Sequence, residues 1–537
     1  MNGFALINGT IYTAFKPVSK VDALVVFRDR VLYTGSENVA LNISRTLNMD
    51  VVDLKGRVVI PGFIDAHMHL DGLGSYLTTL DLRGVRSVEE LKLRLRRYAE
   101  SAKTTWILGR GWDQELFKEK RFPTRWDLDE VVNDKPVVLT RVCGHAAVLN
   151  TKAMVLTGLI NSNSPDVLKD PSGSPSGVVV ERALDVVREK IKESLTYDDF
   201  KKLLTKAMIY AASNGVTTVG FVSADLNSFK TLQKLEVETG RLPVRVRVYL
   251  NPEEAGFNVV KALEALGIVR GFGTEYVRLN GIKIFVDGSL GARTAWLSQP
   301  YADADTVGVP ILNEDSLLKL VNQIHDLGLQ IAIHGIGDKA VETILNVYER
   351  LEGVQFLRHR IEHASVLRPD ILDKLVKVDS VVVVQPHFII TDWWVVNRLG
   401  DVRAQYVYAF KTLLKSGVKI AFSTDSPVEP LNPWDTIYAA VTRGKYENIP
   451  LYELTKHECL SVEEALYSYT EGSAYALFEE KSLGSLEQGM LADFIVVDKD
   501  PLKVGEKELK EIKVLETYTS GLKTYDYAKQ NVEGLST

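Results

Sequence analysis

Several side chains that could bind metal ions stand at the ends of short apolar segments. His67 and His69 follow one such segment, and residues i and i+2 of a β-strand face the same side, so both imidazoles can hold one ion. An isolated His-x-His pair is weak evidence, but four of the nine histidines share this kind of placement. The full set of candidate ligands is His67, His69, Lys283, His334, His363 and Asp425. Together they predict a metal centre.

Lys283 is the least expected of these candidates. It lies among Ile282, Ile284 and Phe285, where a charged lysine is costly to bury, so a structural role would require a partner or a route to solvent. A chemical role is also available. The amine can condense with carbon dioxide to a carbamate, an anion able to bridge two metal ions about 3.5–4 Å apart. In the company of the other ligands, we favour the carbamate over a salt bridge.

Eight apolar, β-branched segments could position these side chains. They alternate with helical patterns such as residues 316–327, where apolar residues recur at helical spacing. This alternation is typical of a parallel sheet buried on both faces, and it predicts an α/β protein with a (β/α)8 TIM barrel. The candidate ligands then fall at the carboxyl ends of the strands, where barrel enzymes keep their sites. The predicted strands span residues 59–65, 216–221, 244–249, 282–286, 330–334, 359–363, 381–385 and 418–423.

The two ends of the chain lie outside this repeat. Short strand patterns separated by turn signals occupy residues 1–58, and a strand-rich pattern returns in residues 481–537. We predict that the two ends form one discontinuous β-sandwich domain beside a barrel at residues 59–480. The individual strand-like segments are 4–7, 23–27, 31–33, 51–54, 484–489 and 492–498.

An interval within the barrel region is also unusual. Residues 71–200 are too many for a connection between barrel strands, and they contain strand-like segments of their own at 106–108 and 137–142. We therefore predict an insertion after the first barrel strand.

Composition limits the classes of function. The 537 residues are 45% apolar and 25% charged, as in a globular protein, and a net charge of −6 gives no footprint for nucleic acid. No apolar stretch approaches the roughly 18 residues of a membrane span, and the N-terminal segment lacks the features of a signal peptide. Cys143 and Cys459 are too few for a disulfide framework. We expect a soluble, cytoplasmic protein that acts on a small molecule, without nucleic-acid or membrane partners.

The chain resembles the amidohydrolase superfamily, and within it the amidohydrolase-3 branch, from end to end. No single motif is specific, but their combination is. The matching segments are PGFIDAHMH at 61–69, GHAAVLN at 144–150, GIKIFVDGS at 281–289, GARTA at 291–295, HGIGD at 334–338, RHRIEHA at 358–364, STDSP at 423–427 and ADFIVVD at 492–498.

This resemblance implies roles for the candidate ligands. It implies that His67, His69 and Asp425 bind one ion, that His334 and His363 bind a second, and that carboxylated Lys283 bridges them. Two Zn2+ ions are the first choice, with Mn2+, Fe2+ or Co2+ as alternatives. The resemblance also suggests a homodimer and places His145 and Arg293 near the substrate. We add Trp112 and His387 as further substrate-binding candidates.

The predicted function is hydrolysis of a non-peptide C–N bond, in an amide, formamide or cyclic amide. A metal-bridging hydroxide would attack, with Asp425 as general base and then general acid. One alternative is a mononuclear deaminase of a cyclic amidine, although such relatives need no lysine in the fourth strand, and a metal count would distinguish the two. Another is a non-catalytic binding protein on the same fold, for which a missing ligand would be the signature.

Two further possibilities concern residues of the insertion. A cysteine hydrolase built on Cys143 and His145 is disfavoured, because nucleophile and base normally come from different segments. We expect Cys143 to be a packing residue instead. If Lys283 is not carboxylated, Glu181 is the next carboxylate to consider as a bridging ligand.

Overall fold

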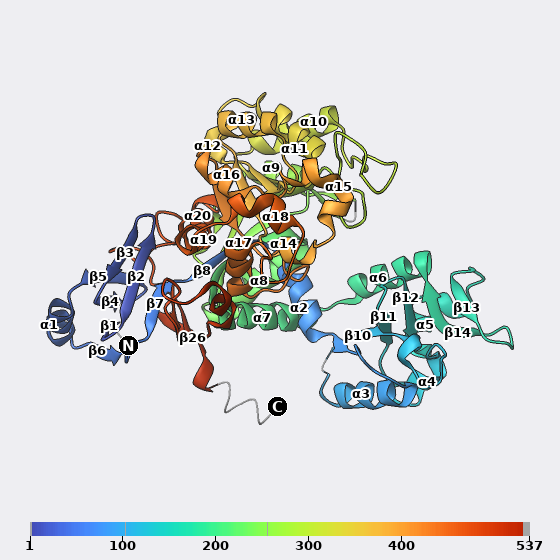
Figure 1. Ribbon diagram of the computed structural model, residues 1–537. Helices are drawn as coiled ribbons and strands as arrows, with labels where there is room; N and C mark the ends of the chain where they lie inside the picture. The colour runs from blue at the N-terminus through green and yellow to red at the C-terminus, as the bar shows by residue number, and fades with distance from the viewer. Residues whose placement is uncertain (1–2, 103, 255, 530–537) are drawn as a thin grey trace. The chain divides into compact units, whose positions relative to one another are not determined.

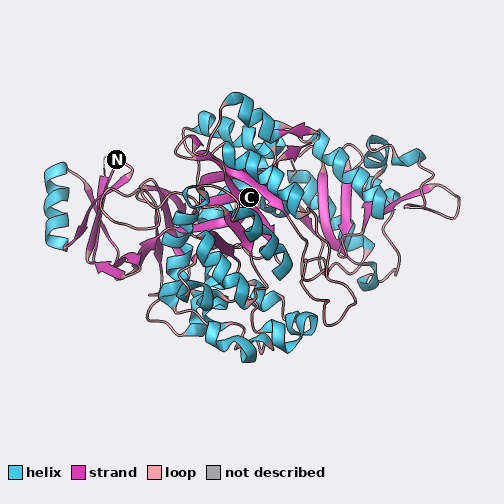
Figure 2. Ribbon diagram, turned by 90° about the horizontal axis from the view of Figure 1, so that it is seen from above, coloured by secondary structure: helices cyan, strands magenta, loops and turns pink. Residues whose placement is uncertain are grey.

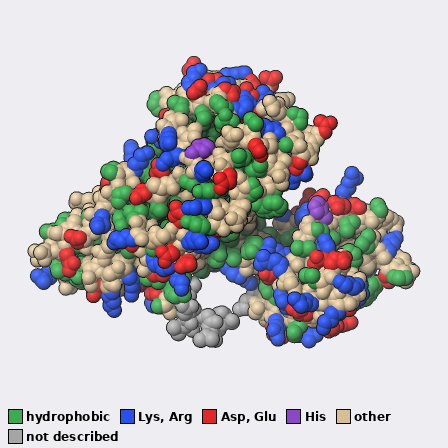
Figure 3. All heavy atoms as spheres, in the orientation of Figure 1, with side chains coloured by type: hydrophobic (Ala, Val, Ile, Leu, Met, Phe, Trp, Pro, Cys, Tyr) green, Lys and Arg blue, Asp and Glu red, His purple; other side chains and the backbone are tan. Residues whose placement is uncertain are grey.

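The computed structural model describes residues 3–102, 104–254 and 256–529, and the chain divides into two compact units (Figure 1). The barrel unit contains Met1–Gly72 and Ala207–Thr537, and the inserted unit contains Leu73–Lys206. The sequence predicts an insertion over residues 71–200, and the inserted unit occupies nearly the same range. On the face drawn in Figure 3, acidic and basic side chains are interspersed. No helix within the described ranges is both long enough and apolar enough to cross a membrane.

The barrel unit is built on eight parallel strands, arranged in chain order. Backbone hydrogen bonds from Asp425 N to His67 O (2.9 Å) and from His69 N to Ser426 O (2.8 Å) connect the ends of the last and first strands. The sheet is therefore a nearly closed barrel, as a TIM fold requires. The strands are β8 (Phe63–Met68), β15 (Val216–Ala224), β16 (Arg245–Leu250), β20 (Val277–Phe285), β21 (Gln330–Gly335), β22 (Arg360–His363), β23 (Val381–Val384) and β24 (Lys419–Phe422).

Helices follow the strands and surround the sheet (Figure 2). In α10, Leu317, Val321 and Ile324 are buried at helical spacing, and the Asn313 side chain accepts from Ser316 N at 2.9 Å to cap the helix. The helix α10 therefore begins at Glu314, two residues before the start of the predicted helical pattern at residue 316. The main barrel helices are α8 (Leu226–Thr239), α9 (Val259–Leu266), α10 (Glu314–Asp326), α11 (Asp338–Tyr348), α13 (Pro369–Val378), α16 (Phe410–Lys415), α17 (Pro433–Thr442), α19 (Val462–Tyr469) and α20 (Glu471–Ala476).

The first predicted barrel strand, 59–65, is in fact two strands. β7 (Val58–Pro61) belongs to a different sheet, and β8 begins only after Gly62. At this switch, Gly62 N donates to Asp493 O and Phe63 N donates to Gly215 O, each at 3.0 Å. A side chain at Gly62 would approach Thr217 Cγ2 to 2.4 Å, so any larger residue would force Thr217 to move. The predicted boundary between residues 58 and 59 therefore falls inside β7.

Two more sheets in the barrel unit use strands from the chain ends. A four-stranded sheet has the order β5-β4-β1-β6, and a six-stranded sheet has the order β27-β26-β25-β7-β2-β3. They share a core in which Phe4 and Leu24 of one sheet meet Phe494 and Tyr518 of the other. Their strands are β1 (Gly3–Ile7), β2 (Thr10–Phe15), β3 (Val18–Val21), β4 (Ala23–Phe27), β5 (Arg30–Gly35), β6 (Asp50–Asp53), β25 (Phe494–Val497), β26 (Val514–Thr519) and β27 (Leu522–Asp526).

The two chain ends thus pair in one sheet, and Figure 1 shows the red β26 near the blue β7. Their description as a sandwich stays a prediction. Residues 484–489, predicted to be strand-like, lie in bends and turns outside any strand. The helix α1 (Glu37–Leu47), which packs on β1 and β4, was not predicted either.

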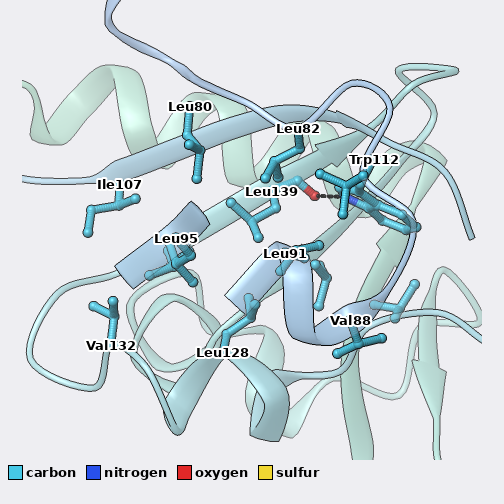
Figure 4. Packing of buried hydrophobic residues seen from close by; sticks show 14 of the residues in the cluster. Leu80, Leu82, Val88, Leu91, Leu95, Ile107, Trp112, Leu128, Val132 and Leu139 are labelled. Atoms are coloured by element: carbon cyan, nitrogen blue, oxygen red, sulfur yellow. Dashed lines mark hydrogen bonds between the residues drawn. The ribbon is translucent and has the colours of Figure 1, made fainter. Parts of the chain in front are cut away.

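The inserted unit is a six-stranded sheet with a hydrophobic core on each face. Alternate residues of β11 serve the two cores: Leu139 points into one and Val138 into the other. Figure 4 shows the first core, where the Trp112 Nε1 donates to Leu139 O at 2.7 Å. The strand order is β13 (Val167–Lys169), β14 (Pro175–Val180), β12 (Ala146–Leu149), β11 (Val137–Arg141), β10 (Ile107–Trp112) and β9 (Leu80–Asp81).

Candidate metal centre and active site

The candidate ligands from distant parts of the sequence line one cavity of about 490 Å³ in the barrel unit. Parallel strands end at a common rim, so side chains at their carboxyl ends converge there. The cavity contains every predicted metal ligand, namely His67, His69, Lys283, His334, His363 and Asp425.

His67, His69 and Asp425 form the tightest group. The Nε2 atoms of both histidines lie 3.2 Å from Asp425 Oδ1, and these three residues offer ligand atoms close enough to hold one ion. Burial opposes ionisation of Asp425, but its interactions with His67 and His69 hold the pKa of the carboxyl well below its usual range. Two imidazoles and an ionised carboxylate are a donor set that suits zinc and similar ions.

His334 and His363 lie side by side, with ring centroids 4.5 Å apart. Burial, with the neighbouring Lys283, lowers the pKa of His334 to about 3, and burial lowers the pKa of His363 well below its usual range. Both rings are therefore neutral, the form that binds metals. His334 Nε2 donates to Gly288 O at 2.9 Å and His363 Nδ1 donates to Gln385 Oε1 at 2.7 Å. These bonds leave His334 Nδ1 and His363 Nε2 to face an ion.

Lys283 is buried, and its amine lacks a hydrogen-bond partner among the described residues. It is 1% exposed, and its Nζ makes no hydrogen bond to any described residue. Burial lowers the pKa of this amine to about 8. An unpaired buried ammonium is costly, whereas a carbamate would remove the positive charge and offer two oxygens to nearby ions. The partnerless amine among histidines and a carboxylate therefore fits the predicted metal group.

A carboxylate that the sequence reasoning missed orients His67. Glu362 is fully buried, contacts His67 Nδ1, and accepts from Arg360 Nε and Nη2, each at 2.7 Å. Burial opposes its ionisation, but Arg360 and His67 hold the pKa of Glu362 below its usual range. A carboxylate on Nδ1 fixes the ring and directs Nε2 toward Asp425. The sequence did contain a signal for this carboxylate, because the charged Arg360 and Glu362 flank an apolar residue in a predicted buried strand.

The predicted substrate-binding residues of the barrel unit lie in different settings. His387 Nδ1 contacts Glu429, which lines the cavity. Arg293 is outside the cavity lining and donates to Asp303 from Nε at 3.0 Å and Nη2 at 2.8 Å. Substrate contact by His387 or Arg293 stays a prediction.

The other two predicted substrate-binding residues belong to the inserted unit. Trp112 is fully buried in the core shown in Figure 4, so its indole has no exposed surface for a substrate, which corrects the prediction made for it. His145 is exposed, with Nδ1 3.5 Å from Glu181 Oε2, and its role stays a prediction. Cys143, expected to be a packing residue, is exposed because it lies in the turn between β11 and β12.

Several known proteins resemble this chain over most of its length. A solved structure of an uncharacterized metal-dependent hydrolase from Pyrococcus horikoshii is 42% identical, covers 94% of this chain and 99% of that chain, and has a TM-score of 0.82. The protein LONG AFTER FAR-RED 3 of Arabidopsis thaliana is 31% identical over 96% of this chain and 91% of its own length. The N-substituted formamide deformylase of Arthrobacter pascens is 26% identical, with coverage of 98% and 99%.

A family-wide comparison covers most of the sequence. The profile of the Amidohydrolase family matches residues 50–525, which include all eight barrel strands and all six candidate ligands. With the barrel and its cavity, this match identifies the chain as a member of the amidohydrolase family of metal-dependent hydrolases.

Proposed function

We propose that this protein hydrolyses a non-peptide C–N bond, in an amide, formamide or cyclic amide. The observation that carries the proposal is the buried, partnerless Lys283 amine in a cavity that also holds four histidines and Asp425. The relative named N-substituted formamide deformylase supports this class of bond. Lys283 also favours a shared binuclear site over the mononuclear deaminase alternative.

The residues divide into two groups around a shared ligand. His67, His69 and Asp425 would hold one divalent ion, and His334 and His363 would hold a second. Carboxylated Lys283 would contribute a ligand to both ions. Zn2+ is the first choice of metal. Such ions, when bound, polarise a carbonyl and lower the pKa of a bound water to about 7. The chain's contribution is to present neutral imidazoles in fixed orientations, through Glu362 behind His67 and Gln385 behind His363.

Asp425 would carry the proton during the reaction. Its lowered pKa keeps the carboxylate ionised. An ionised carboxylate can accept a proton from the attacking water and return it to the departing nitrogen. An amide and water then give a carboxylic acid and an amine.

The test is an assay of metal-free protein reloaded with zinc or with manganese, using N-formyl, N-acyl, ureido and cyclic amide substrates. We expect turnover of at least one class, about two ions per chain, and loss of activity with a chelator.

Asp425→Asn should abolish turnover while most of the metal is retained. Asp305→Asn, which removes the same charge at an exposed position, serves as the control. One ion per chain with ammonia release from a cyclic amidine would favour the deaminase. Full metal content without any turnover would favour the non-catalytic alternative.

A further inference from the structure

The cavity has a second polar wall that this hydrolytic chemistry does not use. It consists of Thr391, Asp392, Tyr408 and Glu429, which we call the acidic wall. Tyr408 Oη donates to Asp392 Oδ2 at 2.6 Å, and Thr391 Oγ1 donates to Glu429 Oε1 at 2.7 Å. His387 Nδ1 contacts the other oxygen of Glu429. The two carboxylates are therefore fixed in place by neighbouring side chains.

One carboxylate oxygen of this wall is open. The Tyr408 hydroxyl makes the only hydrogen bond to the Asp392 carboxylate in the described part of the chain, and it reaches Oδ2 alone. Burial and the nearby Glu429 raise the pKa of Asp392 to about 6, so the group is mostly ionised at neutral pH. Arg398, whose charge influences Asp392, instead donates to Asp303. Within the described part of the chain, Asp392 Oδ1 is thus a hydrogen-bond acceptor that no cationic side chain contacts.

Independent observations mark the cavity as a ligand site. Lys283, partnerless and 1% exposed, lines the same cavity as the acidic wall. The volume of about 490 Å³ is in the range that accommodates small ligands. Phe388 and Val428 add apolar surface beside the two carboxylates. A ligand could therefore contact the metal-binding residues and the acidic wall within one cavity.

We propose that the acidic wall binds a protonated amino group of the substrate, so that the preferred substrates are N-formyl or N-acyl amines carrying a second, cationic amine. This inference rests on the proposed function. The electron-rich carbonyl would face the metal ligands, and the ammonium would face Asp392 and Glu429, an arrangement of complementary charge. Water adds across the C–N bond to give formate, or another carboxylate, and a diamine, and no further reactant is required.

The test compares two substrates of equal length, N-(4-aminobutyl)formamide and N-pentylformamide, with the zinc-loaded enzyme. We expect kcat/KM to be about 10- to 100-fold higher for the charged substrate, mainly through KM, because a hydrogen bond to an ionised group is lost with the neutral one. Asp392→Asn should reduce this ratio to under about 3-fold. The matched control, Asp305→Asn, changes an exposed carboxylate and should leave the ratio unchanged. Equal kcat/KM values, or a preference for the neutral substrate, would overturn the inference.

A binding measurement separates this inference from the proposed function. Calorimetry should show 1,4-diaminobutane binding at least about 10-fold more tightly than butylamine, with the difference lost in Asp392→Asn. If neither formamide is hydrolysed but this difference is found, the acidic wall is supported and the proposed reaction is wrong. If the diamine shows no advantage that depends on Asp392, the acidic wall does not bind an ammonium, whatever the enzyme hydrolyses.

Discussion

Buried charges have different surroundings at the two ends of the barrel. At the amino end of β16, Arg245 and Arg247 are both fully buried, and each reaches a carboxylate: Arg245 Nε donates to Asp493 Oδ2 at 2.9 Å, and Arg247 Nε donates to Glu479. At the carboxyl end of β20, Lys283 is equally buried, but its Nζ has no hydrogen-bond or carboxylate partner among the described residues and lies only over the Phe285 ring, 5.0 Å from the centroid.

This difference separates charges that maintain the fold from a charge kept for a ligand. Taking an ion out of water costs several kcal/mol, and in a folded protein a close partner normally offsets that cost. Arg245 and Arg247 meet this requirement within the chain. For Lys283 the partner must come from outside, which is why a strongly perturbed, buried group in a cavity indicates a functional site.

The largest expected effect is that of removing the partnerless lysine. Lys283→Met should reduce hydrolytic activity by more than about 1000-fold, beyond the 10- to 100-fold typical of a residue that only orients a metal ligand. Metal content should fall below two ions per chain. Because the variant removes an unpaired buried charge, thermal stability of the metal-free protein should be unchanged or higher.

Short carboxylates provide the control for Lys283→Met. Added acetate or propionate could occupy the vacated position and restore part of the metal content and activity. An Lys283→Met protein with full activity and full metal content would contradict the distinction between the two barrel ends. A metal-free variant less stable than the native protein would show that Lys283 has a structural role.

The next effect concerns the opposite end of the barrel and should appear in stability. Glu479→Gln removes the charge that faces Arg247 and Arg278, and we expect the free energy of unfolding to fall by about 3–5 kcal/mol. Metal content and activity per folded molecule should be unchanged. Glu480→Gln is the matched control: its partner Arg358 is partly exposed, so we expect a loss of about 1 kcal/mol or less. Equal losses in the two variants would show that burial does not decide the cost. Urea unfolding measures both.

The sequence was most informative where chemistry coincides with regular strands. His334 and His363 end short β-branched segments, so their strands predicted both the barrel and the convergence of their side chains. The switch at Gly62 was not predictable from pattern, because Val59 and Ile64 are apolar on either side of it and only the close approach of Thr217 reveals it.

Other features depend on tertiary contacts that a single segment does not encode. Trp112 was chosen as a pocket residue for its aromatic ring, but the same apolar surface places it in a core. Asp392, Tyr408 and Glu429 come from irregular connections without periodicity, and only the fold brings them into one wall. Sequence patterns therefore located the metal ligands better than the surfaces that select a substrate.

A smaller effect tests the orientation of a metal ligand. Gln385→Met removes the acceptor for His363 Nδ1, and we expect metal affinity to fall about 10- to 100-fold. Competition with a chelator measures this loss. In the control, Ser423→Ala removes only the hydroxyl that Gln385 Nε2 reaches at 2.9 Å, and affinity should change by less than about 3-fold. Similar losses from both variants would mean that packing, and not the bond to His363, holds the ring.

The smallest effect comes from a half-buried carboxyl whose donor is a backbone group. Glu471 Oε2 accepts from Phe15 N at 2.8 Å, and burial, with a contribution from Glu487, raises the pKa of Glu471 to about 7 from 4.5. The folded state therefore holds this proton more tightly than the unfolded state does. The resulting stability is present in full below pH 4.5 and is lost as the pH rises to about 7. Since the side chain is partly exposed, we expect a loss of about 1 kcal/mol between pH 5 and pH 8.

Glu471→Gln should lack this loss, whereas Glu264→Gln, at an exposed position of α9, should retain it. Unfolding curves at the two pH values decide, and a parallel pH response of Glu471→Gln and the native protein would show that Glu471 is already ionised in the folded state at pH 5.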